Sequence, residues 1–131
     1  RTSTVRGPAR FSHPLPPHAM STSRLLDTFL ALVRCDTPSK QEAAASHWCA
    51  ERLRALGFDV AHDDAGDKVG GTVGNLFAFL PGNVPGAPGL LFSSHLDTVE
   101  ATPNLEVAID GDVVSAASDT ILGADDKCGV A

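Results

Sequence analysis

The chain has 131 residues, of which 43% are hydrophobic and 20% are charged, and its formal net charge at pH 7 is −6. This length permits a domain with a real hydrophobic core, and the composition excludes a wholly disordered, collagen-like or coiled-coil chain. No apolar run approaches the roughly 20 residues that a membrane-spanning helix needs. We therefore expect one globular domain or a piece of a larger one.

The charge is distributed unevenly along the chain. The first 26 residues contain four Arg and no acidic residue, whereas the rest contain six Lys or Arg against sixteen Asp or Glu. Such an acidic body is a poor electrostatic match for nucleic acid or an anionic membrane, but it suits metal cations. We therefore expect no nucleic-acid or membrane partner.

Three cysteines, Cys35, Cys49 and Cys128, show no C-x-x-C spacing, and an odd number cannot all pair within the chain. Reduced thiols are typical of a cytosolic protein, so we predict a cytoplasmic location. Residues 1–19 contain four prolines and no hydrophobic stretch of a secretory signal, and the only methionine, Met20, follows them. We predict that residues 1–19 are a disordered leader or a non-native extension and that residues 20–131 fold.

Two amphipathic helices are predicted first. The stretch RLLDTFLALVRC follows the hydroxyl residues 21–23 and places its apolar residues on one stripe, up to the break at residues 36–38. Ser39 and Glu42 then have the spacing of a capping box, in which the two side chains bond free amides at a helix start. The second helix ends before Gly57.

Strands follow these helices. Residues 58–62 alternate as a short strand, and residues 63–74 read as an acidic, Gly-rich loop. Residues 75–80 and 89–94 are nearly continuous apolar runs, as expected of strands covered on both faces. Residues 107–114 surround an Asp-Gly pair suited to a hairpin turn. The pattern predicts an α/β fold with a mixed, mostly parallel sheet flanked by helices.

The first chemical motif, His95-Leu-Asp97, follows the apolar run at residues 89–94. Alternate strand residues lie on one side, about 7 Å apart at roughly 3.3 Å per residue, so both side chains can converge on one centre where the chain turns. Neutral imidazole is a common metal ligand, and a nearby carboxylate can orient it. The alternative is a histidine that ends a strand beside an incidental surface aspartate.

The second motif is LGADDKCG, residues 122–129. Adjacent acids among small residues are costly to bury unless a cation compensates them, so Asp125 is a candidate for bridging two divalent ions. The alternative is a helix N-terminus at which Asp125 and Asp126 favour the positive end of the dipole and Lys127 points to solvent.

Together, HLDTV at the end of an apolar strand and LGADDKCG farther along resemble the co-catalytic zinc exopeptidases of the peptidase T, aminoacylase and carboxypeptidase G superfamily. The stretch DDAGDKVGGTVGNLFAFLPG and the ending TILGADDK look most like the tripeptidase, or peptidase T-like, branch. The resemblance covers residues 21–131. It implies that residues 20–131 are the truncated N-terminal portion of a metallopeptidase catalytic domain.

Carried over by residue, the resemblance implies that His95 binds one of two Zn²⁺ ions, that Asp97 is the catalytic-site carboxylate that orients His95, and that Asp125 bridges both metals. Asp126 and Lys127 would be supporting residues. Cys128 stands where the family more often has Ala or Gly. A thiol ligand is one interpretation of Cys128, and a small buried packing residue is the favoured one.

The resemblance also places the family's Glu-Glu pair, a further acidic ligand and a distant His after Ala131. His13, His18, His47 and His62 do not substitute for them and are predicted to be surface residues. The expected function is a zinc exopeptidase, tripeptidase- or aminopeptidase-like, that acts on short peptides, with this segment inactive alone. The resemblance allows a homodimer through a domain outside these residues. The alternatives are an amidase of N-acyl amino acids with the same metal centre and a non-catalytic α/β interaction module.

Overall fold

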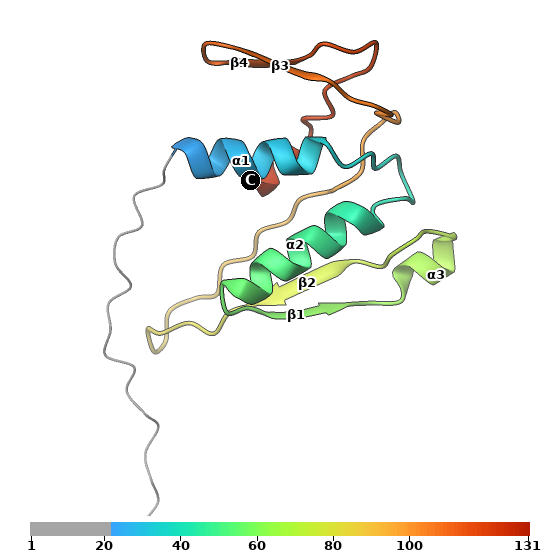
Figure 1. Ribbon diagram of the computed structural model, residues 1–131. Helices are drawn as coiled ribbons and strands as arrows, with labels where there is room; N and C mark the ends of the chain where they lie inside the picture. The colour runs from blue at the N-terminus through green and yellow to red at the C-terminus, as the bar shows by residue number, and fades with distance from the viewer. Residues whose placement is uncertain (1–21) are drawn as a thin grey trace, which may run out of the picture.

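The computed structural model describes residues 22–131. The expectations for residues 1–19, for Met20 and for His13 and His18 lie outside the described residues. The described part contains four helices and four strands in two antiparallel pairs (Figure 1). The elements are α1 (Thr22–Val33), α2 (Ala43–Ala55), β1 (Asp59–His62), α3 (Ala65–Val69), β2 (Leu76–Phe79), β3 (Val107–Asp110), β4 (Val113–Ala116) and α4 (Lys127–Val130).

The helix α2 packs on a two-stranded sheet of β1 and β2 (Figure 1). Asp59 lies opposite Phe79 and His62 opposite Leu76 in antiparallel register. The buried residues of α2 are small, namely Ala45, Ser46, Cys49 and Ala50. Small side chains on this face let a helix come close to the strands that it covers.

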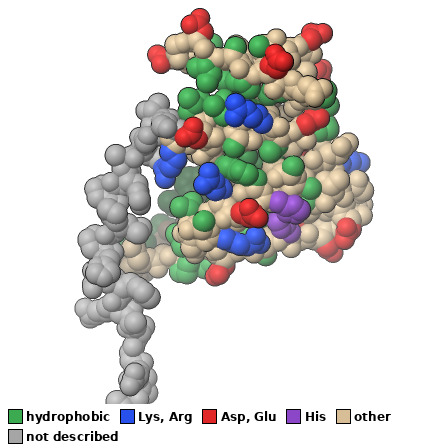
Figure 2. Space-filling model, viewed as in Figure 1, with side chains coloured by type: hydrophobic (Ala, Val, Ile, Leu, Met, Phe, Trp, Pro, Cys, Tyr) green, Lys and Arg blue, Asp and Glu red, His purple; other side chains and the backbone are tan. Residues whose placement is uncertain are grey.

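The hydrophobic core joins α1 to α2. Leu32, Ala45 and Cys49 form its buried cluster, with Leu96 and Val130 among the partly buried side chains packed against it. The core therefore connects both helices to the segment that carries His95 and to the last helix, α4. Figure 2 shows further hydrophobic side chains between α1 and the β3–β4 hairpin, with acidic side chains along the outer edge.

The β3–β4 hairpin confirms the turn predicted from sequence. Asp110 pairs with Val113, so the two loop residues are Gly111 and Asp112, one position later than the Asp-Gly pair suggested. Gly111 has φ of 58°, a left-handed conformation that glycine adopts without the steric penalty of a Cβ.

The α/β class is confirmed, but the expected mostly parallel sheet is wrong for the described residues. Both strand pairs there are antiparallel, and the parallel contact recorded is a single bridge between Pro38 and Thr98. Residues 89–94 form no strand, and Leu90, Leu91 and Phe92 are 84%, 93% and 87% exposed. An apolar run becomes a strand only where a neighbouring backbone supplies hydrogen bonds. No strand of residues 22–131 pairs with the segment 89–94.

Two local expectations also differ from the structure. The stretch 63–74 contains the short helix α3, because Asp63 accepts hydrogen bonds from the amides of Ala65 and Asn75 and closes the turn around it. The capping box is absent: the Glu42 carboxylate accepts the Lys40 amide at 2.6 Å, and Ser39 bonds elsewhere. Within residues 22–131, no helix has the length and hydropathy needed to cross a membrane.

Candidate metal centre

The site begins where two distant segments are joined after the end of α1. The Thr98 amide donates to the Thr37 carbonyl at 2.8 Å, and the Thr37 hydroxyl donates to the Leu96 carbonyl at 2.9 Å. Thr37 and Thr98 are 0% and 2% exposed, so water does not compete for these bonds. We call this arrangement of Thr37, Leu96 and Thr98 the threonine clamp. It holds the chain between Leu96 and Thr98 in one position.

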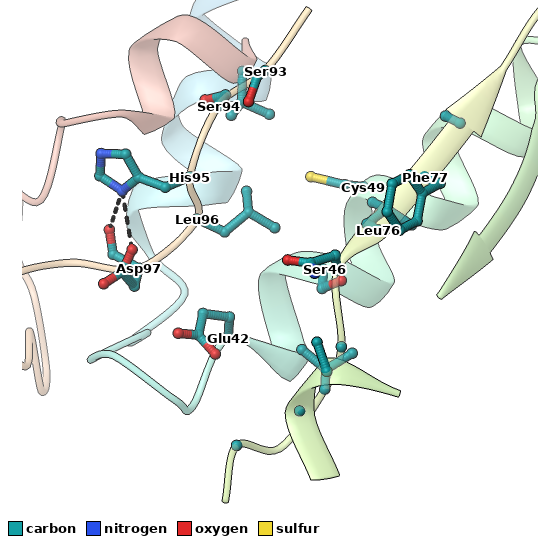
Figure 3. Close-up of a pocket in the computed structure, with 18 of the residues that line it drawn as sticks. Glu42, Ser46, Cys49, Leu76, Phe77, Ser93, Ser94, His95, Leu96 and Asp97 are labelled. Atoms are coloured by element: carbon teal, nitrogen blue, oxygen red, sulfur yellow. Dashed lines mark hydrogen bonds and ion pairs between the residues drawn. The ribbon is translucent and has the colours of Figure 1, made fainter. Parts of the chain in front are cut away.

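Asp97, inside the threonine clamp, orients the ring of His95. The Nδ1 atom of His95 lies 3.1 Å from the backbone carbonyl of Asp97 and 3.1 Å from its Oδ1 (Figure 3). Both of these oxygens are acceptors, so Nδ1 carries a proton, and in the neutral ring Nε2 is the nitrogen left with a lone pair. A metal-binding imidazole requires this arrangement, and Asp97, the carboxylate expected to orient the ring, lies in contact with it.

The free nitrogen of His95 faces Asp125. The distance from His95 Nε2 to Asp125 Oδ1 is 3.3 Å, and the two side chains are 54% and 95% exposed. Two ligands each about 2.0–2.2 Å from one tetrahedral zinc ion lie roughly 3.4 Å apart, so this separation fits a shared ion. The structure thus brings together the imidazole and the aspartate on which the metal prediction depended.

The neighbouring acid, Asp126, turns the other way. Its carboxylate accepts a hydrogen bond from the Ser94 hydroxyl. It also lies close over Gly129, where an added Cβ would meet Asp126 Oδ1 at 2.4 Å. Asp126 is the N-cap residue of α4 but makes no side-chain capping bond. Asp126 thus lies at a helix N-terminus, as the alternative expected, and its carboxylate is bonded to Ser94.

Lys127 is buried, which contradicts the alternative in which it points to solvent. It is 0% exposed, and its Nζ donates to the Cys35 carbonyl at 2.8 Å. Burial lowers the pKa of Lys127, although Cys35 and Asp36 act in the opposite direction. This contact ties the segment that carries Asp125 to the end of α1. The only feature of the sequence that pointed to this contact was a lysine among small residues.

The electrostatics of His95 and Asp97 reinforce each other. Desolvation by itself lowers the pKa of His95, but its interactions with Asp97 and a smaller hydrogen-bond contribution from Asp125 outweigh that effect and raise the pKa above its ordinary value. The hydrogen bond from Ser39, followed by the contribution of His95, holds the pKa of Asp97 below its usual range. Asp97 is therefore an anion at neutral pH and a strong acceptor for the imidazole N–H.

The remaining candidate ligands lie elsewhere. Cys128 is exposed, contrary to the favoured prediction of burial, and lines an apolar pocket with Leu25 and Phe29 that does not include His95. His47 is exposed as predicted, whereas His62 is half-buried and its Nε2 lies 2.8 Å from the Ser46 hydroxyl. No three His, Cys, Asp or Glu side chains of residues 22–131 gather closely enough to hold a metal ion.

A cavity of about 830 Å³ opens beside the site. His95 and Asp97 line one part of it and Phe77 lines another (Figure 3). Ser39 and Phe92 are also among its lining residues. The polar atoms that could bind a metal thus lie next to a space of the size that small ligands occupy.

Comparison with known proteins identifies relatives, although no protein-family model matches the chain. An uncharacterized protein of Bacillus subtilis strain 168, YqjE, is 37% identical over 112 residues, which are 86% of this chain and 30% of that protein. The crystal structure of an aminopeptidase, PepT, from Bacillus cereus superposes with a TM-score of 0.77 at 34% identity. A tripeptidase from Staphylococcus aureus superposes with a TM-score of 0.76 at 35% identity. Each structural match covers 82% of this chain and 29% of the other, so the chain spans less than a third of the length of these relatives.

Proposed function

We propose that this chain, whose described part has the fold of the corresponding part of the peptidase T-like exopeptidases, belongs to a zinc-dependent enzyme that hydrolyses short peptides. The observation that carries the proposal is the 3.3 Å approach of His95 Nε2 to Asp125 Oδ1. A shared fold alone does not imply a shared activity, so the argument rests on this pair.

The donor set fits zinc. In its neutral form His95 would offer the Nε2 lone pair, and Asp125 would offer an exposed carboxylate to the metal pair. Asp97 acts on the imidazole and binds no metal itself. When bound, a pair of zinc ions supplies an activated water and polarises the scissile carbonyl.

Two ligands do not make a catalytic zinc site, which needs at least three protein ligands and an open position. We therefore propose that the remaining ligands and the general base come from other parts of the full-length protein, and that residues 1–131 alone are inactive. Free cysteines support a cytoplasmic location for this enzyme. The expected substrate is a short peptide, and the expected cofactor is two Zn²⁺ ions.

Removing either proposed ligand tests this function. In the full-length protein, we expect His95→Ala and Asp125→Ala to lower the zinc content measured by mass spectrometry. Loss of a supporting partner alone costs roughly 10–100-fold in metal affinity or activity, so loss of a ligand should reduce tripeptide hydrolysis by more than about 100-fold.

The exposed residues His47 and Asp119 supply matched controls, because His47→Ala and Asp119→Ala make the same chemical changes away from the site. Both controls should keep the zinc content and activity of the wild type. Unchanged zinc and activity in both ligand variants would contradict the proposal. Zinc-dependent cleavage of N-acyl amino acids without cleavage of peptides would instead favour the amidase alternative.

A further inference from the structure

We propose that Ser39 is a positioning residue for His95, acting through Asp97. This inference rests on the proposed function and adds to it a residue that neither sequence motif contains. The Ser39 hydroxyl donates to Oδ2 of Asp97, while Oδ1 of the same carboxylate lies 3.1 Å from His95 Nδ1. The two oxygens of Asp97 therefore contact different side chains, and the order of contacts runs from Ser39 to Asp97, His95 and Asp125.

The threonine clamp holds Ser39 in place. Pro38, the preceding residue, forms the parallel bridge with Thr98, the residue after Asp97. The Thr98 amide donates to the Thr37 carbonyl at 2.8 Å, and the Thr98 hydroxyl donates to the Glu100 carbonyl at 2.7 Å. The backbone on both sides of the contact is thus paired, and the Ser39 hydroxyl meets Asp97 without needing to order a mobile loop.

The local structure around Ser39 departs from what its sequence favours. Ser39 has the spacing of a helix cap, but its hydroxyl bonds Asp97, and α2 begins only at Ala43. Lys40, the next residue, has φ of 75°, a conformation that residues with a Cβ rarely adopt. Such departures persist where the surrounding structure holds them, and they are typical of functional sites.

The chemical consequence concerns the direction of the imidazole lone pair. A carboxylate held at one oxygen cannot rotate freely about its Cβ–Cγ bond, so its other oxygen stays opposite His95 Nδ1. His95 then keeps its Nε2 lone pair toward Asp125. Without the serine hydroxyl, water replaces the contact, Asp97 samples other rotamers and the ring loses its fixed direction. We expect the effect mainly in metal affinity, because supporting partners of a ligand act there.

Zinc affinity of the full-length apoprotein tests the proposal, measured by competition with a chromogenic chelator. We expect Ser39→Ala to weaken zinc binding roughly 10–100-fold, as loss of other partners behind metal-binding residues does. Ser39→Thr keeps a hydroxyl and should restore affinity to within about threefold of the wild type. Ser115→Ala, the same change at an exposed position of β4, should bind zinc as the wild type does.

A second measurement does not depend on zinc. In the apoprotein, at a pH high enough to make the His95 ring neutral, its ¹⁵N NMR signals report which nitrogen carries the proton, and Ser39→Ala should show a mixture of the two tautomers in place of one. If Ser39→Ala reduces the melting temperature of the apoprotein substantially, Ser39→Cys, which keeps the size but donates weakly, should show the same loss of affinity.

The outcomes separate this proposal from the proposed function. If His95→Ala loses zinc but Ser39→Ala and Ser39→Cys bind zinc with wild-type affinity and one tautomer, the Ser39 proposal is overturned and the function stands. If Ser39→Ala raises only the KM for peptide at saturating zinc, Ser39 contacts substrate and the positioning role is also overturned. If His95→Ala keeps its zinc, the proposed function itself fails.

Discussion

Asp125 and Asp126 are neighbours in sequence, yet their carboxylates have different partners. Asp125 is exposed and lies opposite His95 Nε2, whereas Asp126 accepts a bond from Ser94 and packs over Gly129. The side chains of consecutive residues can point in different directions. One carboxylate of an adjacent pair can therefore face a metal site while the other contacts the protein. The assignment of the metal-facing role to Asp125 rather than Asp126 agrees with this geometry.

Cys49 provides a prediction at the scale of one residue. Its thiol is 5% exposed, and burial, with a smaller contribution from Cys35, raises its pKa to about 11 from an ordinary value of 9.0. The thiolate is the reactive form, and a rise of two pKa units reduces its fraction at pH 8 about 100-fold. The test uses a full-length protein with Cys35 and Cys128 replaced by Ala. We expect iodoacetamide to label Cys49 at least about 100-fold more slowly in the native protein than in the protein unfolded by urea.

The rate should rise as the pH approaches 11, because the thiolate then becomes populated. The control is the companion variant that keeps Cys35 alone, whose thiol is only partly buried and whose pKa is also raised by burial. Peptide mass spectrometry measures the labelling of Cys49. Equal rates in the native and the unfolded protein would show that this thiol is not buried.

At the scale of elements, hydrophobic periodicity predicted where the helices lie but not how much of the apolar face of each helix is buried. Both predicted helices formed, and Leu32 and Val33 at the end of α1 are 0% exposed. Leu25, on the same predicted stripe, is 42% exposed, and Leu56 after α2 is 66% exposed. Periodicity identifies the face of a helix that can be buried, but a neighbouring element decides how much of that face is covered.

Lys127 connects two such elements and provides the prediction at this scale. We expect Lys127→Met, which keeps the apolar stem but removes the donor to the Cys35 carbonyl, to lower the free energy of unfolding by about 1–3 kcal/mol. Urea unfolding of the full-length protein, followed by circular dichroism, measures the change.

Lys68 supplies the matched control for this measurement. Its Nζ lies 2.7 Å from Asp64 Oδ1, but the two side chains are 68% and 70% exposed. Exposed ion pairs contribute little, so Lys68→Met should change the free energy of unfolding by less than about 1 kcal/mol. Equal effects of the two substitutions would argue against a structural role for the buried ammonium.

At the scale of the whole molecule, the apolar segment 90–92 lies outside the core. Its three side chains are more exposed than Phe77 and Phe79 of β2, which are themselves 58% and 65% exposed. An extended apolar segment with unpaired backbone groups is a template for association with other chains.

We therefore expect a chain of residues 1–131 to self-associate at micromolar concentration and to bind a hydrophobic dye. Leu91→Lys combined with Phe92→Lys should reduce both effects, because charge on an exposed apolar segment opposes its pairing with another chain. Asn83→Lys, a charge added at an exposed polar position, is the control. Light scattering measures the mass, and a monomer without dye binding in the unsubstituted chain would contradict this expectation.

The sequence by itself determined the α/β class, both long helices, the β3–β4 hairpin and the two motifs that hold His95, Asp97 and Asp125. These features depend on periodicity, turn chemistry and short spacings, which act over a few residues. The prediction of a strand at residues 89–94 failed because a strand depends on a partner backbone, which local sequence does not report.

Only the tertiary structure decided which distant groups meet. The bond from Ser39 to Asp97 spans 58 positions, and that from Lys127 to Cys35 spans 92. The capping-box spacing predicted that Ser39 caps a helix, and the helix-terminus alternative predicted that Lys127 points to solvent. Both predictions use only neighbouring residues, so they could not include the distant partners. Packing selected the other partners, since a buried ammonium needs an acceptor and a clamped serine lies within reach of the carboxylate that orients His95.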